Sequence, residues 1–180
     1  MTVHIFVDET KAKGYVIAAA TLLEGDLAAP RKRVQALVLP RQRSLHMKDE
    51  SNSRRRQIID TILEMADTSG LTTVIYDAGR EGTELERRAV CLATLVADAA
   101  LHAEARIVLD LDESLQAWDR QRLIEYRRAA GLRDRLTYAH QARTDELLLS
   151  IPDAIAWSWA RGGEWRTRVK PVVRYVRVRA

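Results

Sequence analysis

Three segments rich in β-branched and apolar residues each end on an aspartate, and helix-like segments separate them. These segments are V-H-I-F-V-D at 3–8, L-T-T-V-I-Y-D at 71–77 and R-I-V-L-D at 106–110. Between them, residues 51–67 repeat isoleucine at helical spacing, and residues 84–103 contain neither glycine nor proline. Such alternation of strands and helices is typical of an α/β fold in which several strands run parallel.

Further elements follow from local patterns. A second β-like segment, 14–21, comes after a short polar turn, so we expect the chain to open with a hairpin. Residues 27–39 fit either a short helix begun near Pro30 or extended chain, and we favour the helix. The remaining predictions are strands at 44–48, 136–141 and 171–178, and helices at 114–130 and 150–161 with Ser150 as N-cap. The expected fold class is therefore α/β, with a mixed sheet that opens on an N-terminal antiparallel hairpin.

Length and composition narrow the class of protein. A chain of 180 residues is the size of one domain, so we expect a single unit over 1–180. The longest apolar run, 16–23, is too short to cross a bilayer, which predicts a cytoplasmic protein with no membrane partner. The single cysteine excludes an internal disulfide and a thiolate zinc cage. The sequence has no glycine-rich phosphate loop, serine-hydrolase elbow or H-E-x-x-H motif.

Basic residues, nearly all of them arginine, gather in two stretches of the chain, 31–56 and 161–179. Lysine and arginine total 29 against 25 acidic residues, which gives a formal net charge of +4. Because the guanidinium fork matches phosphate oxygens, these stretches favour a nucleic-acid partner; the alternative is that they are ordinary solvated surface residues. The residues we select as nucleic-acid contacts are Arg41, Arg43, Lys48, Arg54 and Arg55.

Four aspartates far apart in the sequence are candidates for one metal site. Asp8, Asp77 and Asp110 end predicted strands, and in an open α/β sheet ligand sites gather at the carboxyl ends of parallel strands. Asp153 lies in the first turn of a late helix. Carboxylate oxygens suit Mg²⁺ or Mn²⁺, and two such ions can stabilise both the attacking and the leaving oxygen of a phosphodiester. The alternative for each aspartate is a turn-forming or helix-capping role.

Four short motifs occur in order along the chain: V-D-E-T at 7–10, L-H-M-K-D at 45–49, R-I-V-L-D at 106–110 and I-P-D-A-I-A-W at 151–157. They resemble the opening Asp-Glu-Ser-Gly signature, the histidine-containing strand, the mid-chain strand ending in Asp and the late Gln-x-Ala-Asp helix of the domain of unknown function 3800 family. That family is similar to ribonuclease H in fold. The resemblance covers nearly the whole chain and implies an α/β fold with a ribonuclease H-like mixed sheet, an N-terminal antiparallel hairpin and helices on both faces. It also implies a metal-dependent nuclease site carried by Asp8, Asp110 and Asp153.

Two more residues are candidates for the chemistry. Glu9 points away from Asp8 if the strand continues, and it joins the site only if the chain turns there; the family resemblance favours a catalytic role. His46 either activates a water or assists departure of the leaving group, since imidazole titrates near neutral pH. The alternative for His46 is a strand-end histidine that bonds the backbone.

Asp77 and Asp112 are secondary candidates. Asp77 resembles Asp110 in position, and the sequence does not decide which of the two strands neighbours the first one. The chain also departs from the family, because Lys11 stands where glycine is usual, and a lysine beside the acids would neutralise charge that a metal ion should neutralise.

These patterns favour a metal-dependent nuclease that hydrolyses phosphodiesters through a carboxylate cluster. The alternative is a catalytically inactive module with a ribonuclease H-like fold that binds nucleic acid or protein. The sequence leaves open the choice between DNA, RNA and hybrid, and it leaves the oligomeric state unknown.

Overall fold

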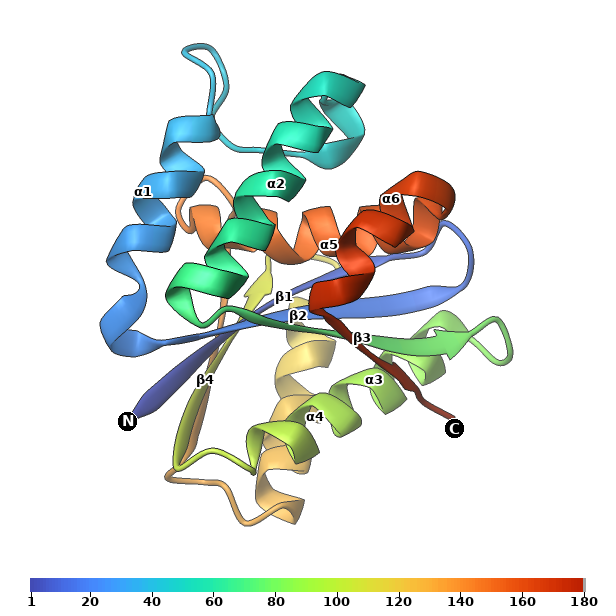
Figure 1. Ribbon diagram of the computed structural model, residues 1–180. Helices are drawn as coiled ribbons and strands as arrows, with labels where there is room; N and C mark the ends of the chain where they lie inside the picture. Colours follow the sequence, from blue (N-terminus) through green and yellow to red (C-terminus); the bar gives the residue numbers. More distant parts are fainter. Residues whose placement is uncertain (180) are drawn as a thin grey trace.

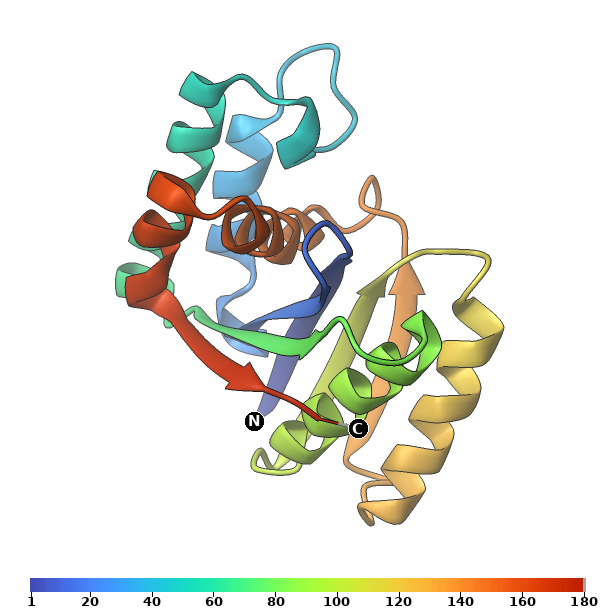
Figure 2. The same ribbon diagram turned by 90° about the vertical axis from the view of Figure 1, so that its right-hand side faces the viewer.

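The computed structural model describes residues 1–179, whose strands form one six-stranded sheet. The strands are β1 (Thr2–Thr10), β2 (Tyr15–Leu23), β3 (Thr72–Gly79), β4 (Glu104–Asp110), β5 (Leu136–Gln141) and β6 (Val173–Arg177). Their order across the sheet is β5-β4-β1-β2-β3-β6. Strand β2 is antiparallel to β1 and β3, whereas β4 is parallel to β1, β5 to β4 and β6 to β3. The carboxyl ends of β1, β4 and β5 therefore meet at one edge of the sheet (Figure 2).

Helices cover both faces of the sheet (Figure 1). The α-helices are α1 (Ala28–Leu37), α2 (Asn52–Ser69), α3 (Glu84–Ala99), α4 (Gln116–Ala129), α5 (Ser150–Arg161) and α6 (Gly163–Val169). Short 3₁₀ helices are η1 (Glu24–Asp26), η2 (Met47–Asp49), η3 (Leu147–Leu149) and η4 (Lys170–Val172). Helices α1, α2, α5 and α6 lie on one face, and α3 and α4 lie on the other. No helix within residues 1–179 is both long and apolar enough to cross a membrane.

The alternation of side chains along β1 divides the core between the two faces. Val3 and Val7 belong to the apolar cluster under α3 and α4, whereas Phe6 belongs to the cluster under α5. Small residues line both surfaces where α5 crosses the sheet, including Ala18 on β2 and Ala154 on α5, and both are fully buried. This lack of bulk lets the first turn of α5 approach the end of β1.

Local signals explain where several helices begin and end. The Ser51 hydroxyl accepts a hydrogen bond from the backbone N–H of Arg54 and caps α2. Gly70 ends that helix with φ +64°, a conformation that favours glycine. Helix α3 begins with a capping box formed by Thr83 and Glu86.

The prediction of a strand at 44–48 is wrong. Residues 44–46 form a loop, and residues 47–48 belong to the short helix η2. The Met47 N–H donates to the Asp153 carboxylate at 2.9 Å, and Arg55 donates to the carbonyl oxygens of Met47 and Lys48 at 2.8 and 3.0 Å. Side chains therefore satisfy this backbone, and no neighbouring strand is needed to do so.

Two helix predictions need smaller corrections. The helix predicted over 84–103 ends at Ala99, because residues 100–103 form turns before β4 begins. Ser150 is the first residue of α5 rather than its N-cap, since η3 leads directly into the helix and Leu149 holds the cap position. The short helix α6 was not among the predicted elements. The predicted mixed α/β sheet, with its N-terminal hairpin and helices on both faces, is confirmed.

Candidate active site at the carboxyl edge of the sheet

Asp8, Asp110 and Asp153, which we call the aspartate cluster, converge on the guanidinium of Arg143. Nη2 of Arg143 donates to Oδ2 of Asp8 at 2.8 Å and also to Oδ2 of Asp110. Nη1 lies 3.1 Å from Oδ1 of Asp153. Asp8 and Asp110 stand together because β1 and β4 are parallel neighbours, and α5 brings Asp153 over them from one face.

Arg143 is buried at the centre of this arrangement, with only 6% of its side chain exposed. Its Nη1 also donates to the Leu45 carbonyl at 3.3 Å and to Nδ1 of His46 at 2.9 Å. Its Nε is buried and has no hydrogen-bond partner among residues 1–179. The guanidinium therefore lies at the point where the sequence predicts a metal ion. With all groups ionised, the three carboxylates and one guanidinium leave a net charge of −2.

The environment of the aspartate cluster disfavours ionisation of its innermost member. Burial raises the pKa of Asp8 well above its usual range; Arg143 opposes this rise, and the charges of Asp153 and Asp110 add to it. One guanidinium therefore compensates the charge of the three carboxylates, including that of Asp8, only in part.

His46 and the backbone of η2 complete the rim of the site. A guanidinium N–H can only donate, so Nδ1 of His46 accepts from Arg143 and the ring proton belongs on Nε2. The Met47 N–H donates a hydrogen bond to Oδ2 of Asp153, and Arg55 donates one to the Met47 carbonyl oxygen. The Arg55 guanidinium also lies over the Trp157 ring, 4.5 Å from its centre. These contacts fix the position of His46 and Asp153 relative to each other.

Glu9 lies on the opposite face of the sheet, within a buried set of side chains that we call the Arg88 network: Glu9, Tyr15, Arg88, Asp119 and His140. Arg88 forms an ion pair with Glu9 and donates to Asp119 through two nitrogens at 2.6 and 2.7 Å. It also donates to the Tyr15 hydroxyl at 2.7 Å, and His140 lies 3.2 Å from Asp119. The chain does not turn at Glu9, so the structure does not bring Glu9 together with Asp8.

The secondary candidates also lie outside the aspartate cluster. Asp77 lies near the end of β3, two strands away from β1; it accepts hydrogen bonds from the Gly79 N–H and the Tyr175 hydroxyl and pairs with Arg177. Asp112 accepts from Ser114 N–H at 2.9 Å in the turn before α4. The neighbour of β1 that supplies an aspartate is therefore β4, with Asp110.

Lys11 does not neutralise the aspartate cluster. Its Nζ lies 2.6 Å from Glu84 and 3.8 Å from Glu9, on the side of the sheet that carries the Arg88 network. The neutralising cation is an arginine from another part of the chain.

The five basic residues selected as nucleic-acid contacts fall into two groups. Arg41, Arg43 and Lys48 are exposed, in and beside the loop that contains His46. Arg54 and Arg55 are held by hydrogen bonds within the fold. Contact with nucleic acid stays a prediction for all five residues. The exposed side chains of Arg41, Arg43 and Lys48 are the more accessible ones for such a contact.

Arg143 is the residue that the sequence reasoning missed. A signal was present, because the strand at 136–141 was predicted and the α/β pattern implied that it runs parallel to its neighbours. In the structure Asp110 pairs with Gln141, so Arg143 lies two residues beyond the end of the strand next to β4. Any polar residue at that position reaches the same edge as Asp110.

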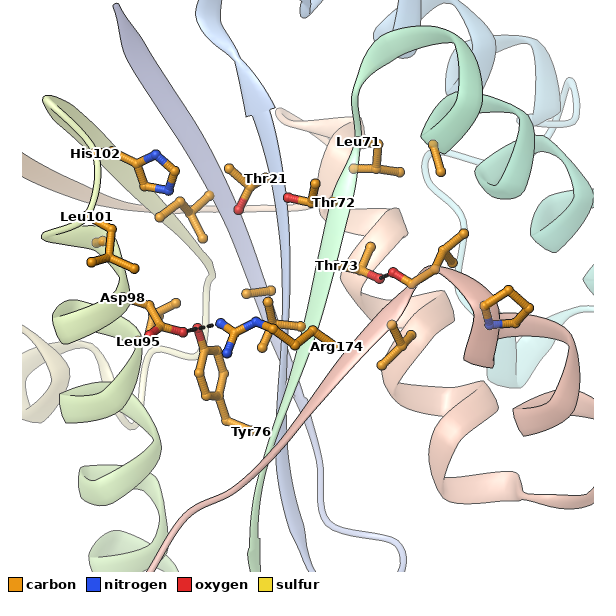
Figure 3. A pocket seen from close by; sticks show the side chains of 18 residues that line it. Thr21, Leu71, Thr72, Thr73, Tyr76, Leu95, Asp98, Leu101, His102 and Arg174 are labelled. Carbon is orange, nitrogen blue, oxygen red and sulfur yellow. Dashed lines mark hydrogen bonds and ion pairs between the residues drawn. The ribbon is translucent and has the colours of Figure 1, made fainter.

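A cavity of about 640 Å³ lies at the start of β3 and β6, lined by the end of α3 on one side and by Ala66 of α2 and Pro171 on the other (Figure 3). At its wall the Tyr76 hydroxyl donates to Asp98 at 2.7 Å, and Arg174 pairs with the same carboxylate. Most of the other lining residues are apolar. Neither Arg143 nor any residue of the aspartate cluster lines this cavity, so the two are distinct.

No family model and no curated protein matches this sequence. Among solved structures, the chain is similar to a chain in the structure of the PCNA:RNase HII complex from Archaeoglobus fulgidus, with a TM-score of 0.55 and 16% sequence identity. The match covers 95% of this chain and 77% of that one. The chain has a ribonuclease H-like fold. The likeness at this level of identity concerns the fold alone, and it confirms the predicted fold class.

Proposed function

We propose that this protein is a divalent-metal-dependent nuclease that hydrolyses phosphodiesters at the aspartate cluster. The observation that carries the proposal is the convergence of Asp8, Asp110 and Asp153 on one guanidinium, at the edge of the sheet where parallel strands end. Acids separated by such long stretches of chain gather in a partly buried site only at a cost, and binding of a cation is the usual compensation. The ribonuclease H-like fold agrees with this choice.

The donor set fits Mg²⁺ or Mn²⁺ in its chemistry. Asp8, Asp110 and Asp153 offer only carboxylate oxygens, the ligands that hard divalent ions prefer. When ionised, the three carboxylates carry more negative charge than one guanidinium compensates, so the cluster favours a divalent cation. When bound, the ion would supply Lewis acidity and activation of a water molecule.

The surrounding residues of the chain have roles of their own in this proposal. His46, fixed through Nδ1, directs its Nε2 proton away from Arg143, where it suits a phosphate or leaving-group oxygen. The exposed Arg41, Arg43 and Lys48 provide positive charge beside the site, which suits the backbone of a nucleic-acid strand.

The proposal is tested by incubating the purified protein with labelled RNA, DNA and RNA–DNA hybrid, with and without Mn²⁺ or Mg²⁺. We expect cleavage that requires the metal. Asp8→Asn, Asp110→Asn and Asp153→Asn should each lower the rate by about a hundredfold or more, the scale of losing one electrostatic stabiliser of a transition state. Asp77→Asn is the matched control, since this strand-end aspartate lies outside the aspartate cluster; it should cleave at the wild-type rate.

If none of the three substrates gives a metal-dependent product, the proposal that this protein is a nuclease is refuted. An equal loss in Asp77→Asn and Asp8→Asn, with both variants folded by circular dichroism, would refute the assignment of the site.

One observation favours a second candidate function, a binding module that has the fold but does not turn over substrate. Arg143 already supplies a buried cation to the aspartate cluster. Such a module would bind nucleic acid with an affinity that falls steeply with salt and is indifferent to Mn²⁺. Fluorescence anisotropy of a labelled strand across salt concentrations distinguishes it from the nuclease.

A further inference from the structure

We propose that Arg143 holds the cation position of the aspartate cluster and must withdraw before a divalent ion binds there. The inference rests on the proposed function for the identity of the ion, and it concerns how occupancy of that site is controlled. In this view Arg143 partly compensates the carboxylates of the resting chain, and metal binding is an exchange of one cation for another.

The contacts of Arg143 explain why the two cations exclude each other. Two guanidinium nitrogens reach all three carboxylates, and one of them is shared by Asp8 and Asp110. A divalent ion would use the same oxygens. In the described part of the chain, no group of three acidic, histidine or cysteine side chains is arranged around a common metal position.

Burial explains why the position is filled. The side chains of Asp8, Asp110 and Asp153 are only 12%, 24% and 18% exposed. Like charges held this close and partly removed from water repel strongly. A cation from the chain itself relieves that repulsion when no ion is present.

The position of Arg143 in the chain allows its side chain to move away from the three carboxylates. It lies in the turn between β5 and η3, and the next two residues, Thr144 and Asp145, are exposed. Its Nε makes no hydrogen bond among residues 1–179, although it is buried, and the bond to the Leu45 carbonyl is long at 3.3 Å. The three carboxylates that a metal ion would take over therefore make most of the polar contacts of this side chain, and the bond to Nδ1 of His46 at 2.9 Å is the one other short contact that withdrawal would break.

The experiment titrates Mn²⁺ alone into the protein by isothermal calorimetry, without nucleic acid. Arg143→Met removes the charge while keeping an unbranched side chain, and we expect it to bind Mn²⁺ at least about tenfold more tightly than the wild type. Arg143→Lys keeps the charge but offers one nitrogen in place of the fork, and its affinity should lie between the two. Adding Asp8→Asn to Arg143→Met should abolish the gain.

Thermal unfolding provides a second measurement. Without metal, Arg143→Met should unfold at a lower temperature than the wild type, because three carboxylates lose their cation. Mn²⁺ should raise the unfolding temperature of Arg143→Met by more than it raises that of the wild type. If Arg143→Met fails to fold, the same comparison between Arg143→Lys and the wild type decides the matter.

Equal Mn²⁺ affinity in the wild type and Arg143→Met would overturn the inference, and so would weaker binding in the variant, which would make Arg143 a support for the ligands. The proposed function fails by a different result. If Arg143→Met binds Mn²⁺ more tightly but the wild type cleaves no substrate, the cation exchange is supported and the nuclease function is refuted. If the wild type cleaves in a metal-dependent way but Arg143→Met binds Mn²⁺ no more tightly than the wild type, the nuclease function is supported and the cation exchange is refuted.

Discussion

Replacing Arg88 by methionine removes the centre of the Arg88 network and tests whether that network is structural. The side chains of Arg88 and Asp119 are each only 2% exposed, and two short hydrogen bonds join them. Methionine fills much of the same volume but cannot pair with Asp119. The carboxylate would then be left buried, with His140 as its remaining partner.

The expected cost follows from this burial. Removing one partner of a buried ion pair costs about 3 to 5 kcal/mol, because the other charge stays out of water. Glu9 adds little to this figure, since its side chain is 20% exposed and water can replace Arg88 there. For a domain of this size, where each kcal/mol shifts the melting temperature by about 2 to 4 °C, the variant should melt about 6 to 20 °C lower.

Urea unfolding at pH 7, followed by tryptophan fluorescence, measures the loss. Arg33→Met is the matched control, because the Arg33 and Glu64 side chains are 37% and 68% exposed and such pairs contribute less than about 1 kcal/mol. A double variant, Arg88→Met with Asp119→Leu, removes both charges and should recover most of the lost stability.

A loss in Arg88→Met no larger than that in Arg33→Met would refute the reasoning. A double variant less stable than Arg88→Met would also contradict it, since the cost would then come from packing and not from an unpaired charge.

Two further predictions concern stability. Burial by itself would raise the pKa of Asp119, but hydrogen bonds from Arg88 and His140 outweigh burial and lower it, so the contribution of Asp119 is complete above about pH 4 and is lost below. Urea unfolding at several pH values should therefore show the difference between wild type and Asp119→Asn shrinking below about pH 4; a constant difference would contradict it. Thr83→Ala removes the hydroxyl that caps α3 and should cost about 1 kcal/mol in the same assay, and an unchanged unfolding midpoint would contradict the cap.

Much of the fold could be predicted because its signals are local. The alternation in β1, the apolar run in β2, the helical spacing in α2 and the serine and glycine at its ends depend only on residues close in sequence. The strand prediction for residues 44–48 is wrong because Asp153 and Arg55 satisfy the backbone there, and the sequence pattern of the segment itself does not reveal these partners.

The sequence predicts the acidic residues of the candidate site but not its cation, Arg143. Asp8, Asp110 and Asp153 carry motif and strand-end signals, and the structure brings all three together. The choice of Asp110 over Asp77 required the strand order, and the face occupied by Glu9 required knowing that β1 continues through it. Arg143 carried only a weak signal, since arginine is common throughout this chain.

The sequence by itself determined which segments become strands and helices and which acids end the strands, because hydrophobic periodicity and capping act over a few residues. The tertiary structure alone decided that β4 and β5 lie beside β1, and hence that Arg143 lies among Asp8, Asp110 and Asp153. Pairing between strands joins residues far apart in the chain, and it is set by how the whole sheet packs against its helices, so no local pattern contains it.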